Sequence, residues 1–300
     1  VGTPHYLKIL EQEATSIIKQ LRRYPCLAFW CGGNELFNSW SGMDEQSAAL
    51  RLLNKLCYEL DPERPFMMTA PLEGMAHGSY TFVSPPDNKD VFERFNGSRC
   101  TAYSEFGVPS LSPADSLRRI IPEDEVFPIV ETPAWVAHHG FHAFIGDTWT
   151  CNSVYDHYYG TATTLEERVE QSNRIQSIGY QAIFEEARRQ WPHCSMALNW
   201  CFNEPWITAG NNSLVAYPNI PKPALFAVAN SLSGQVPSAR IPKFHWDAGE
   251  TFSAQLWYLN DLPQTAQDEV TVTLTVNGID MERFSKHDES DFRASLGIKP

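Results

Sequence analysis

The stretch that decides the fold reads Cys26-Leu-Ala-Phe-Trp-Cys-Gly-Gly-Asn-Glu35. Its apolar part predicts a short strand over Cys26–Cys31, of the wholly apolar kind that is covered on both faces in a parallel sheet. The apolar run ends abruptly at two glycines, so Asn34 and Glu35 follow where the strand leaves the sheet. The pattern therefore predicts an amide and a carboxylate at a strand exit.

A second stretch repeats this layout. It reads Cys100-Thr-Ala-Tyr-Ser-Glu-Phe-Gly107 and places Glu105 at the end of another apolar run. Cleavage of a glycosidic bond uses a pair of carboxyl groups, one of which transfers a proton. Rigid strand ends can hold such a pair despite their distance in sequence, so Glu35 and Glu105 together predict an enzyme.

Helical and strand patterns alternate along most of the chain, which predicts βαβ units and an α/β fold. The expected helices are Pro4–Arg23, Asp44–Leu60, Leu165–Trp191 and Pro221–Ser231. The further expected strands are Pro65–Ala70, Gly78–Val83, Cys100–Ser104 and Cys194–Phe202. Residues 107–163 are rich in Pro, Gly, His and aromatic residues, and we expect a long functional loop there.

The composition shifts near Gly234. Beyond it, Phe252–Tyr258 and Glu269–Val276 alternate with a period of two, as antiparallel strands do. We therefore expect an α/β domain over residues 1–234 and the start of a β-sandwich over residues 235–300.

The composition also excludes some classes of function. A net charge of −13 with dispersed acidic residues argues against a nucleic-acid partner, and no apolar stretch is long enough to span a membrane. The cysteines show no metal-ligand spacing, and we expect buried free thiols where they lie in or beside apolar strands. They are Cys26, Cys31, Cys57, Cys100, Cys151, Cys194 and Cys201, of which Cys57 and Cys151 lie outside those strands.

Four motifs, in the right order, resemble glycoside hydrolase family 2, most closely its β-mannosidase branch. The segment from Arg22 to Glu35 resembles the acid/base segment of that family, and Ser104-Glu-Phe-Gly107 resembles the nucleophile segment. Asn199-Trp-Cys-Phe-Asn-Glu-Pro-Trp206 is similar to its eighth-strand signature, and Pro221-Lys-Pro-Ala-Leu225 to the segment before the last barrel helix. The similarity covers about residues 5–262.

The resemblance implies the second half of a TIM (β/α)8 barrel, about strands four to eight, followed by an incomplete all-β sandwich. Family members carry two β domains and the first three barrel strands before this point. We therefore expect the chain to be a fragment that lacks the N-terminal domains of its parent protein, and to be unfolded or inactive alone. The resemblance implies no localisation.

The resemblance also assigns roles. Glu35 would be the acid/base and Glu105 the nucleophile, with Asn34 binding the sugar 2-hydroxyl. Tyr80 would hydrogen-bond the nucleophile, and Trp200 would be the platform for the cleaved sugar. Trp135 and His138 would lie at the mouth of the pocket as further substrate-binding residues.

Other polar and aromatic residues have plainer interpretations. Glu204, a third strand-end carboxylate, is expected to form a structural ion pair or hydrogen bond, and Trp206 is expected in the core. Asn211-Asn-Ser213 fits a glycosylation pattern, but backbone hydrogen bonding in a turn is the favoured reading.

The implied function is a retaining β-glycosidase that hydrolyses terminal β-linked sugars and needs no metal or other cofactor. Phe106 after Glu105 favours a β-mannoside, whereas β-galactoside, β-glucuronide and β-glucosaminide remain open as substrates. A carbohydrate-binding protein derived from the enzyme is the alternative of another class, although binding alone does not require two carboxylates.

Overall fold

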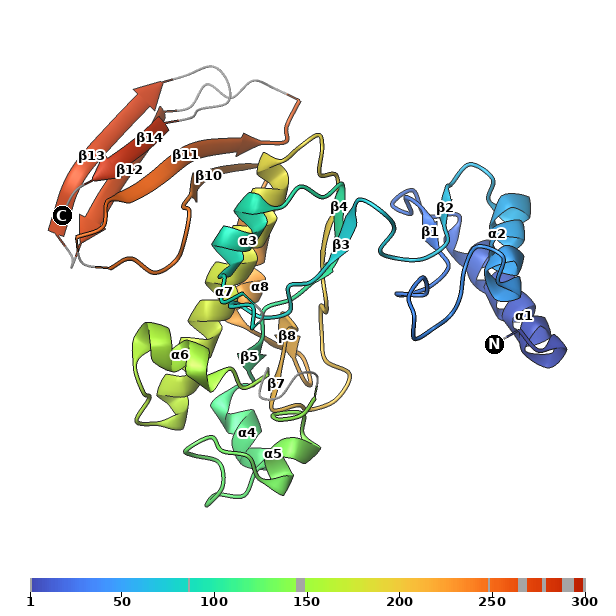
Figure 1. The fold of residues 1–300 in the computed structure, drawn as a ribbon, viewed down its shortest axis with the longest axis horizontal. Helices are drawn as coiled ribbons and strands as arrows, with labels where there is room; N and C mark the ends of the chain where they lie inside the picture. Colours follow the sequence, from blue (N-terminus) through green and yellow to red (C-terminus); the bar gives the residue numbers. More distant parts are fainter. Residues whose placement is uncertain are drawn as a thin grey trace. The chain divides into compact units, whose positions relative to one another are not determined.

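The computed structural model describes residues 2–85, 87–143, 149–247, 249–263, 269–276, 279–287 and 294–298. The chain is mixed α/β and divides into two compact units, Val1–Ala76 and His77–Pro300. Figure 1 shows the elements of each unit. None of the helices among the described residues is both long enough and apolar enough to cross a membrane.

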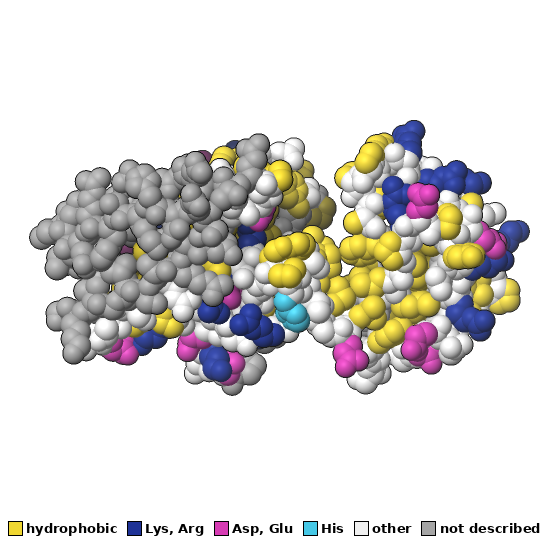
Figure 2. Space-filling model, turned by 90° about the horizontal axis from the view of Figure 1, so that it is seen from above, with side chains coloured by type: hydrophobic (Ala, Val, Ile, Leu, Met, Phe, Trp, Pro, Cys, Tyr) yellow, Lys and Arg dark blue, Asp and Glu magenta, His cyan; other side chains and the backbone are white. Residues whose placement is uncertain are grey.

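The first unit packs two helices, α1 (Pro4–Leu21) and α2 (Ala48–Leu60), beside a short parallel pair, β1 (Trp30–Cys31) and β2 (Phe66–Met67). Thr3 caps α1 by accepting a hydrogen bond from the Tyr6 N–H at 3.3 Å. The core between the helices is formed by Ala14, Ile18, Leu56 and Cys57, with Trp30 and Phe66 packed against it. Figure 2 shows hydrophobic side chains gathered on the visible face of this unit, at the right of the view.

The strand predicted over Cys26–Cys31 is much shorter, because only its last two residues pair with β2. Cys26 and Cys31 are exposed, so the prediction that their thiols are buried is wrong for these two. Cys26 lies in a turn before β1, and among the described residues β1 itself has a strand neighbour on one side only. Cys194 is buried as predicted, and Cys100 and Cys201 are half-buried.

In the second unit, β4 (Ala102–Phe106) pairs with β6 (Ala197–Asn199). The strand β3 (Met75–His77), at the point where the chain passes from the first unit to the second, pairs with the other edge of β4. β4 and β6 are parallel, as expected for a βαβ fold. The long helix α7 (Leu165–Arg189) packs against α3 (Val91–Gly97) and α8 (Pro223–Ser231). Phe106 at the end of β4 contacts Phe184 of α7 with ring centroids 5.1 Å apart.

Residues 107–163 are not one long loop. They contain β5 (Ser110–Leu111), α4 (Ala114–Ile120), α5 (Pro133–Ala137) and α6 (Asn152–Tyr159). Their apolar side chains, which include Leu111, Leu117 and Trp135, share a core with Leu165 and Val169 of α7 and with Ala209. The strand expected over Gly78–Val83 is also wrong, since the nearby strand β3 ends at His77. Three short strands, β7 (Gly210–Asn211), β8 (Val215–Ala216) and β9 (Ile220–Pro221), follow β6.

The C-terminal part is antiparallel. β10 (Gln235–Arg240), β11 (Phe252–Asn260) and β14 (Ala294–Ile298) form one sheet, and β12 (Glu269–Val276) pairs with β13 (Ile279–His287). The two strands predicted from their alternation are confirmed as β11 and β12. The domain boundary expected at about residue 234 stays a prediction.

A buried ionic cluster joins β10 to α7. Glu186 accepts from Arg189 at 2.8 Å and from Arg240 at 3.0 Å, and Arg189 also donates to Ser238 on β10 at 2.5 Å. Burial lowers the pKa of Arg189 despite the opposing effect of Glu186. Because a buried charge that loses its partner is strongly destabilising, these contacts fix β10 against the helix.

Candidate active site

At the exit of β1, backbone contacts set the position of Glu35. Its N–H donates to the Ala70 carbonyl at 2.7 Å, and Asn34 and Ala70 form a parallel bridge. Glu35 has a φ of 51°, a left-handed conformation that is uncommon for a residue other than glycine. Gly32 is required, because a Cβ there would lie 2.6 Å from the Met68 carbonyl oxygen. The left-handed conformation of Glu35 is a form of backbone strain, and strained residues cluster at functional sites.

At the end of β4, side-chain contacts set the position of Glu105. The Tyr80 hydroxyl donates to Glu105 Oε1 at 2.7 Å, and His77 Nδ1 lies 3.9 Å from Oε2. The neighbouring Gly107 has no room for a side chain, since a Cβ would lie 2.4 Å from the Nδ2 of Asn212. The hydrogen bond expected between Tyr80 and Glu105 is thus present.

Trp200, directly after β6, joins this group. Its indole meets the Tyr80 ring edge-on, with centroids 6.0 Å apart and an interplanar angle of 79°. Trp149 stacks on the indole of Trp200, with ring centroids 6.1 Å apart and an interplanar angle of 26°. Trp200 is 41% exposed, so an aromatic surface accompanies the carboxylate of Glu105.

Trp135 and His138 have other partners within the second unit. Trp135 is fully buried on α5, and its indole N–H donates to the Glu125 carbonyl at 3.0 Å. That burial leaves no ring face for a sugar. His138 is half-buried, and its ring lies 5.9 Å from that of Trp206. Trp206 itself is exposed, so its expected place in the core is wrong; it packs against histidine rings at the surface instead.

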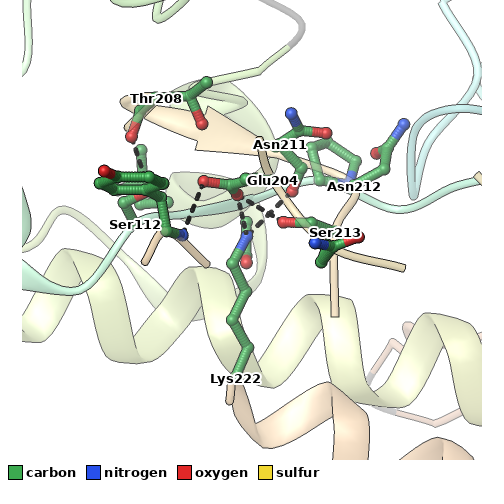
Figure 3. A network of polar contacts seen from close by, with 12 residues as sticks. Ser112, Glu204, Thr208, Asn211, Asn212, Ser213 and Lys222 are labelled. Atoms are coloured by element: carbon green, nitrogen blue, oxygen red, sulfur yellow. Dashed lines mark hydrogen bonds and ion pairs between the residues drawn. The ribbon is translucent and has the colours of Figure 1, made fainter. Parts of the chain in front are cut away.

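Glu204 forms the structural ion pair that the sequence predicts. Its carboxylate lies 3.4 Å from the Lys222 ammonium and accepts a hydrogen bond from Ser213, as Figure 3 shows. Both members of the ion pair are buried, and burial lowers the pKa of Lys222 against the opposing effect of Glu204. Lys222 also donates to the Asn211 carbonyl at 3.2 Å. The backbone hydrogen bonding in a turn expected for Asn211–Ser213 is not seen, because Asn211 belongs to β7 and the Ser213 hydroxyl bonds Glu204.

The sequence reasoning missed three contributors: His77, Trp149 and Lys222. His77 belongs to no recognisable motif, and no sequence pattern near it indicates a contact with Glu105. Trp149 lies far from Trp200 in the chain. Lys222 was visible only as a residue of the Pro221-Lys-Pro motif, whose lysine has no apparent partner until the fold brings Glu204 to it. Among the described residues, no group of three or more His, Cys, Asp or Glu side chains is placed to hold a metal ion.

No protein-family model matches the chain. Known proteins are similar to it in sequence and in fold. β-Mannosidase B of Neosartorya fischeri is 22% identical over 327 residues, which cover 95% of this chain and 37% of that protein. β-Mannosidase B of Aspergillus clavatus is 21% identical over 324 residues. The chain therefore spans only 37% of the length of these curated relatives.

Solved structures share the fold. The β-D-mannosidase of Dictyoglomus thermophilum superposes with a TM-score of 0.76 at 19% identity, covering 99% of this chain and 38% of that chain. The exo-chitosanase of Amycolatopsis orientalis gives a TM-score of 0.69 at 14% identity, covering 98% and 34%. At low identity, these relatives and neighbours together support a relationship of the glycoside hydrolase family 2 kind.

Proposed function

We propose that this chain carries the catalytic residues of a retaining β-glycosidase. The observation that carries the proposal is the group at the ends of β4 and β6, where Tyr80 holds the Glu105 carboxylate beside the exposed ring of Trp200. A fixed carboxylate next to an aromatic surface suits attack on a sugar whose apolar face rests on the ring. The similarity to β-mannosidases at the level of sequence and fold supports the same function.

In the proposed mechanism, Glu105 attacks the anomeric carbon while Glu35, protonated, gives its proton to the departing oxygen. Glu35 then takes a proton from water, which hydrolyses the glycosyl–enzyme bond at Glu105. Tyr80 keeps one carboxylate oxygen of Glu105 engaged, so the other oxygen is oriented for attack. The mechanism requires the two carboxyl groups to stand about 5 Å apart. Asn34 would bind the sugar 2-hydroxyl.

We propose further that residues 1–234 contribute about strands four to eight of a (β/α)8 barrel and that residues 235–300 begin a β-sandwich. The parallel pairs β1–β2 and β4–β6 and the antiparallel strands after residue 234 support this division. The activity would then belong to a longer protein, in line with the length of the curated relatives. Its partner is a carbohydrate substrate, and the proposed chemistry uses no metal or organic cofactor.

A β-mannoside is the favoured substrate, because Phe106 follows the proposed nucleophile and the curated relatives are named β-mannosidases. A β-glucosaminide is the second candidate, supported by the shared fold of the exo-chitosanase. Hydrolysis of aryl β-mannoside, β-glucosaminide, β-galactoside and β-glucuronide by the full-length protein separates these sugars. A carbohydrate-binding protein without activity would hydrolyse none of them.

The decisive experiment replaces the nucleophile. In the full-length protein, Glu105→Ala should abolish hydrolysis of the aryl glycoside, and added azide should restore release of the aryl group with an α-glycosyl azide as product. The matched control is Glu123→Gln, an exposed carboxylate on the same unit, which should leave hydrolysis unchanged. Undiminished hydrolysis by Glu105→Ala would refute the assignment.

A further inference from the structure

The loop after Glu35 is held together by its own side chains. Asn38 Nδ2 donates to the Glu35 carbonyl at 2.5 Å, and Asn38 Oδ1 accepts from the Ser41 N–H at 3.0 Å. The Ser41 hydroxyl donates back to the Leu36 carbonyl and accepts from the Met43 N–H. Gly42, with a φ of 64°, provides the left-handed residue that closes the turn. The sequence from Leu36 to Met43 therefore forms a fixed loop.

This loop presents aromatic side chains to solvent. Trp40 is 72% exposed and Phe37 is also exposed, although both are large apolar groups. A single exposed aromatic residue is ordinary on a protein surface. Two of them on one fixed loop, directly after the proposed proton donor, are less easily explained by chance, since a rigid aromatic surface is what a sugar ring stacks on.

Covalent geometry keeps Trp40 near Glu35. The hydrogen bond from the Ser41 hydroxyl to the Leu36 carbonyl closes the loop. Trp40 directly precedes Ser41, and Glu35 directly precedes Leu36. The path through this bond limits the separation of the two Cα atoms to at most about 15 Å. The span is short enough for a single pyranose ring to contact both side chains.

We propose that Trp40 forms the binding platform for the leaving-group sugar, the ring on the reducing side of the bond that is cleaved. The proposal rests on the proposed role of Glu35. A general acid must reach the glycosidic oxygen within hydrogen-bonding distance, and the leaving-group ring begins one bond beyond that oxygen. The loop that carries the acid is therefore the part of the chain beside that ring. The substrate class is an oligosaccharide or glycoconjugate with a sugar, rather than a small alcohol, as leaving group.

The test compares two substrates that differ in the leaving-group ring. Methyl β-mannoside and β-1,4-mannobiose both release an alcohol, but only mannobiose offers a second pyranose ring. In the full-length protein, Trp40→Ala should lower kcat/KM for mannobiose about tenfold to a hundredfold while that for methyl β-mannoside changes less than about twofold, and Trp40→Phe should recover most of the loss. If the aryl series selects another sugar, the methyl glycoside and β-1,4-disaccharide of that sugar are used.

The matched control is Tyr58→Ala. Tyr58 is 76% exposed on α2 of the same unit, so the variant removes an equally exposed aromatic ring away from the loop. Equal losses for both substrates, or none for mannobiose, would overturn the proposal for Trp40. The proposed function fails separately: without any hydrolysis by the unaltered protein, or with full activity in Glu105→Ala, the enzyme assignment itself is wrong.

Discussion

The two strand exits place their carboxylate-bearing residues on different backbone conformations. Glu35 is placed through its main chain, by the hydrogen bond to Ala70 and a left-handed φ. Glu105 lies within β4, where the register with β6 shifts between Tyr103 and Phe106. Its carboxylate oxygens contact Tyr80 and His77. A nucleophile must keep one orientation and one charge state, which donors to its oxygens favour. A group that gives and takes a proton has two charge states during the reaction, and this is the role proposed for Glu35.

The largest effect should come from removing the proposed acid/base, Glu35. Glu35→Gln in the full-length protein should lower kcat/KM for mannobiose by about 10²–10⁴-fold, because it removes the proton donor. Aryl glycosides with good leaving groups should suffer less in the first step. Azide should rescue this variant with a β-glycosyl azide, the opposite anomer to that from Glu105→Ala. The same anomer from both variants would show that the roles are assigned wrongly.

A second large effect should come from the buried ion pair of Glu204 and Lys222 in the second unit. Lys222→Ala leaves Glu204 buried without its cation and should lower the free energy of unfolding by about 3–5 kcal/mol. Lys55 is the matched control, because its pair with Glu59 at 3.8 Å is exposed. Lys55→Ala should cost at most about 0.5 kcal/mol. Similar losses in the two variants, measured by denaturant unfolding, would contradict the structural role of Lys222.

A smaller effect should follow from removing one donor to the nucleophile. Tyr80→Phe deletes the hydroxyl that bonds Glu105 and keeps the ring that meets Trp200. Hydrogen bonds to charged groups contribute about 1.5–3 kcal/mol, so kcat/KM should fall about tenfold to a hundredfold. Tyr58→Phe, which removes an exposed hydroxyl, should have no effect on kcat/KM. An unchanged kcat/KM in Tyr80→Phe would mean that the contact does not orient Glu105.

The smallest effect concerns backbone strain at Glu35. Both Glu35→Ala and Glu35→Gly remove the carboxylate, but only glycine adopts a φ of 51° without a steric penalty. The glycine variant should be the more stable of the two by about 1 kcal/mol in denaturant unfolding. An alanine variant as stable as the glycine variant would show that the left-handed conformation carries no strain.

The sequence predicted what local patterns determine. An apolar run that stops at glycines marks a strand exit, which is why Glu35 and Glu105 could be named in advance. The helix α7 was predicted almost to its end because its periodicity extends over many turns. The short helices α4 and α5 were missed because they pack in a core shared with distant residues rather than being specified by their own pattern. The helix α6 was missed because it is held against α7, for example by the ion pair of Asp156 with Arg168. His77, Trp149 and Lys222 were missed for the same reason, since their partners lie far away in the chain.

The close approach of Gly107 to Asn212 limits which substitutions this protein can accept during evolution. A methyl group at position 107 would overlap the Asn212 amide, so position 107 can take a larger residue only if residue 212 moves or becomes smaller. Substitutions at the two positions are therefore coupled, and we expect related sequences with a larger residue at 107 to carry a smaller one at 212. The end of β4 would then evolve as a pair with the turn after β7, although more than a hundred residues of sequence separate them.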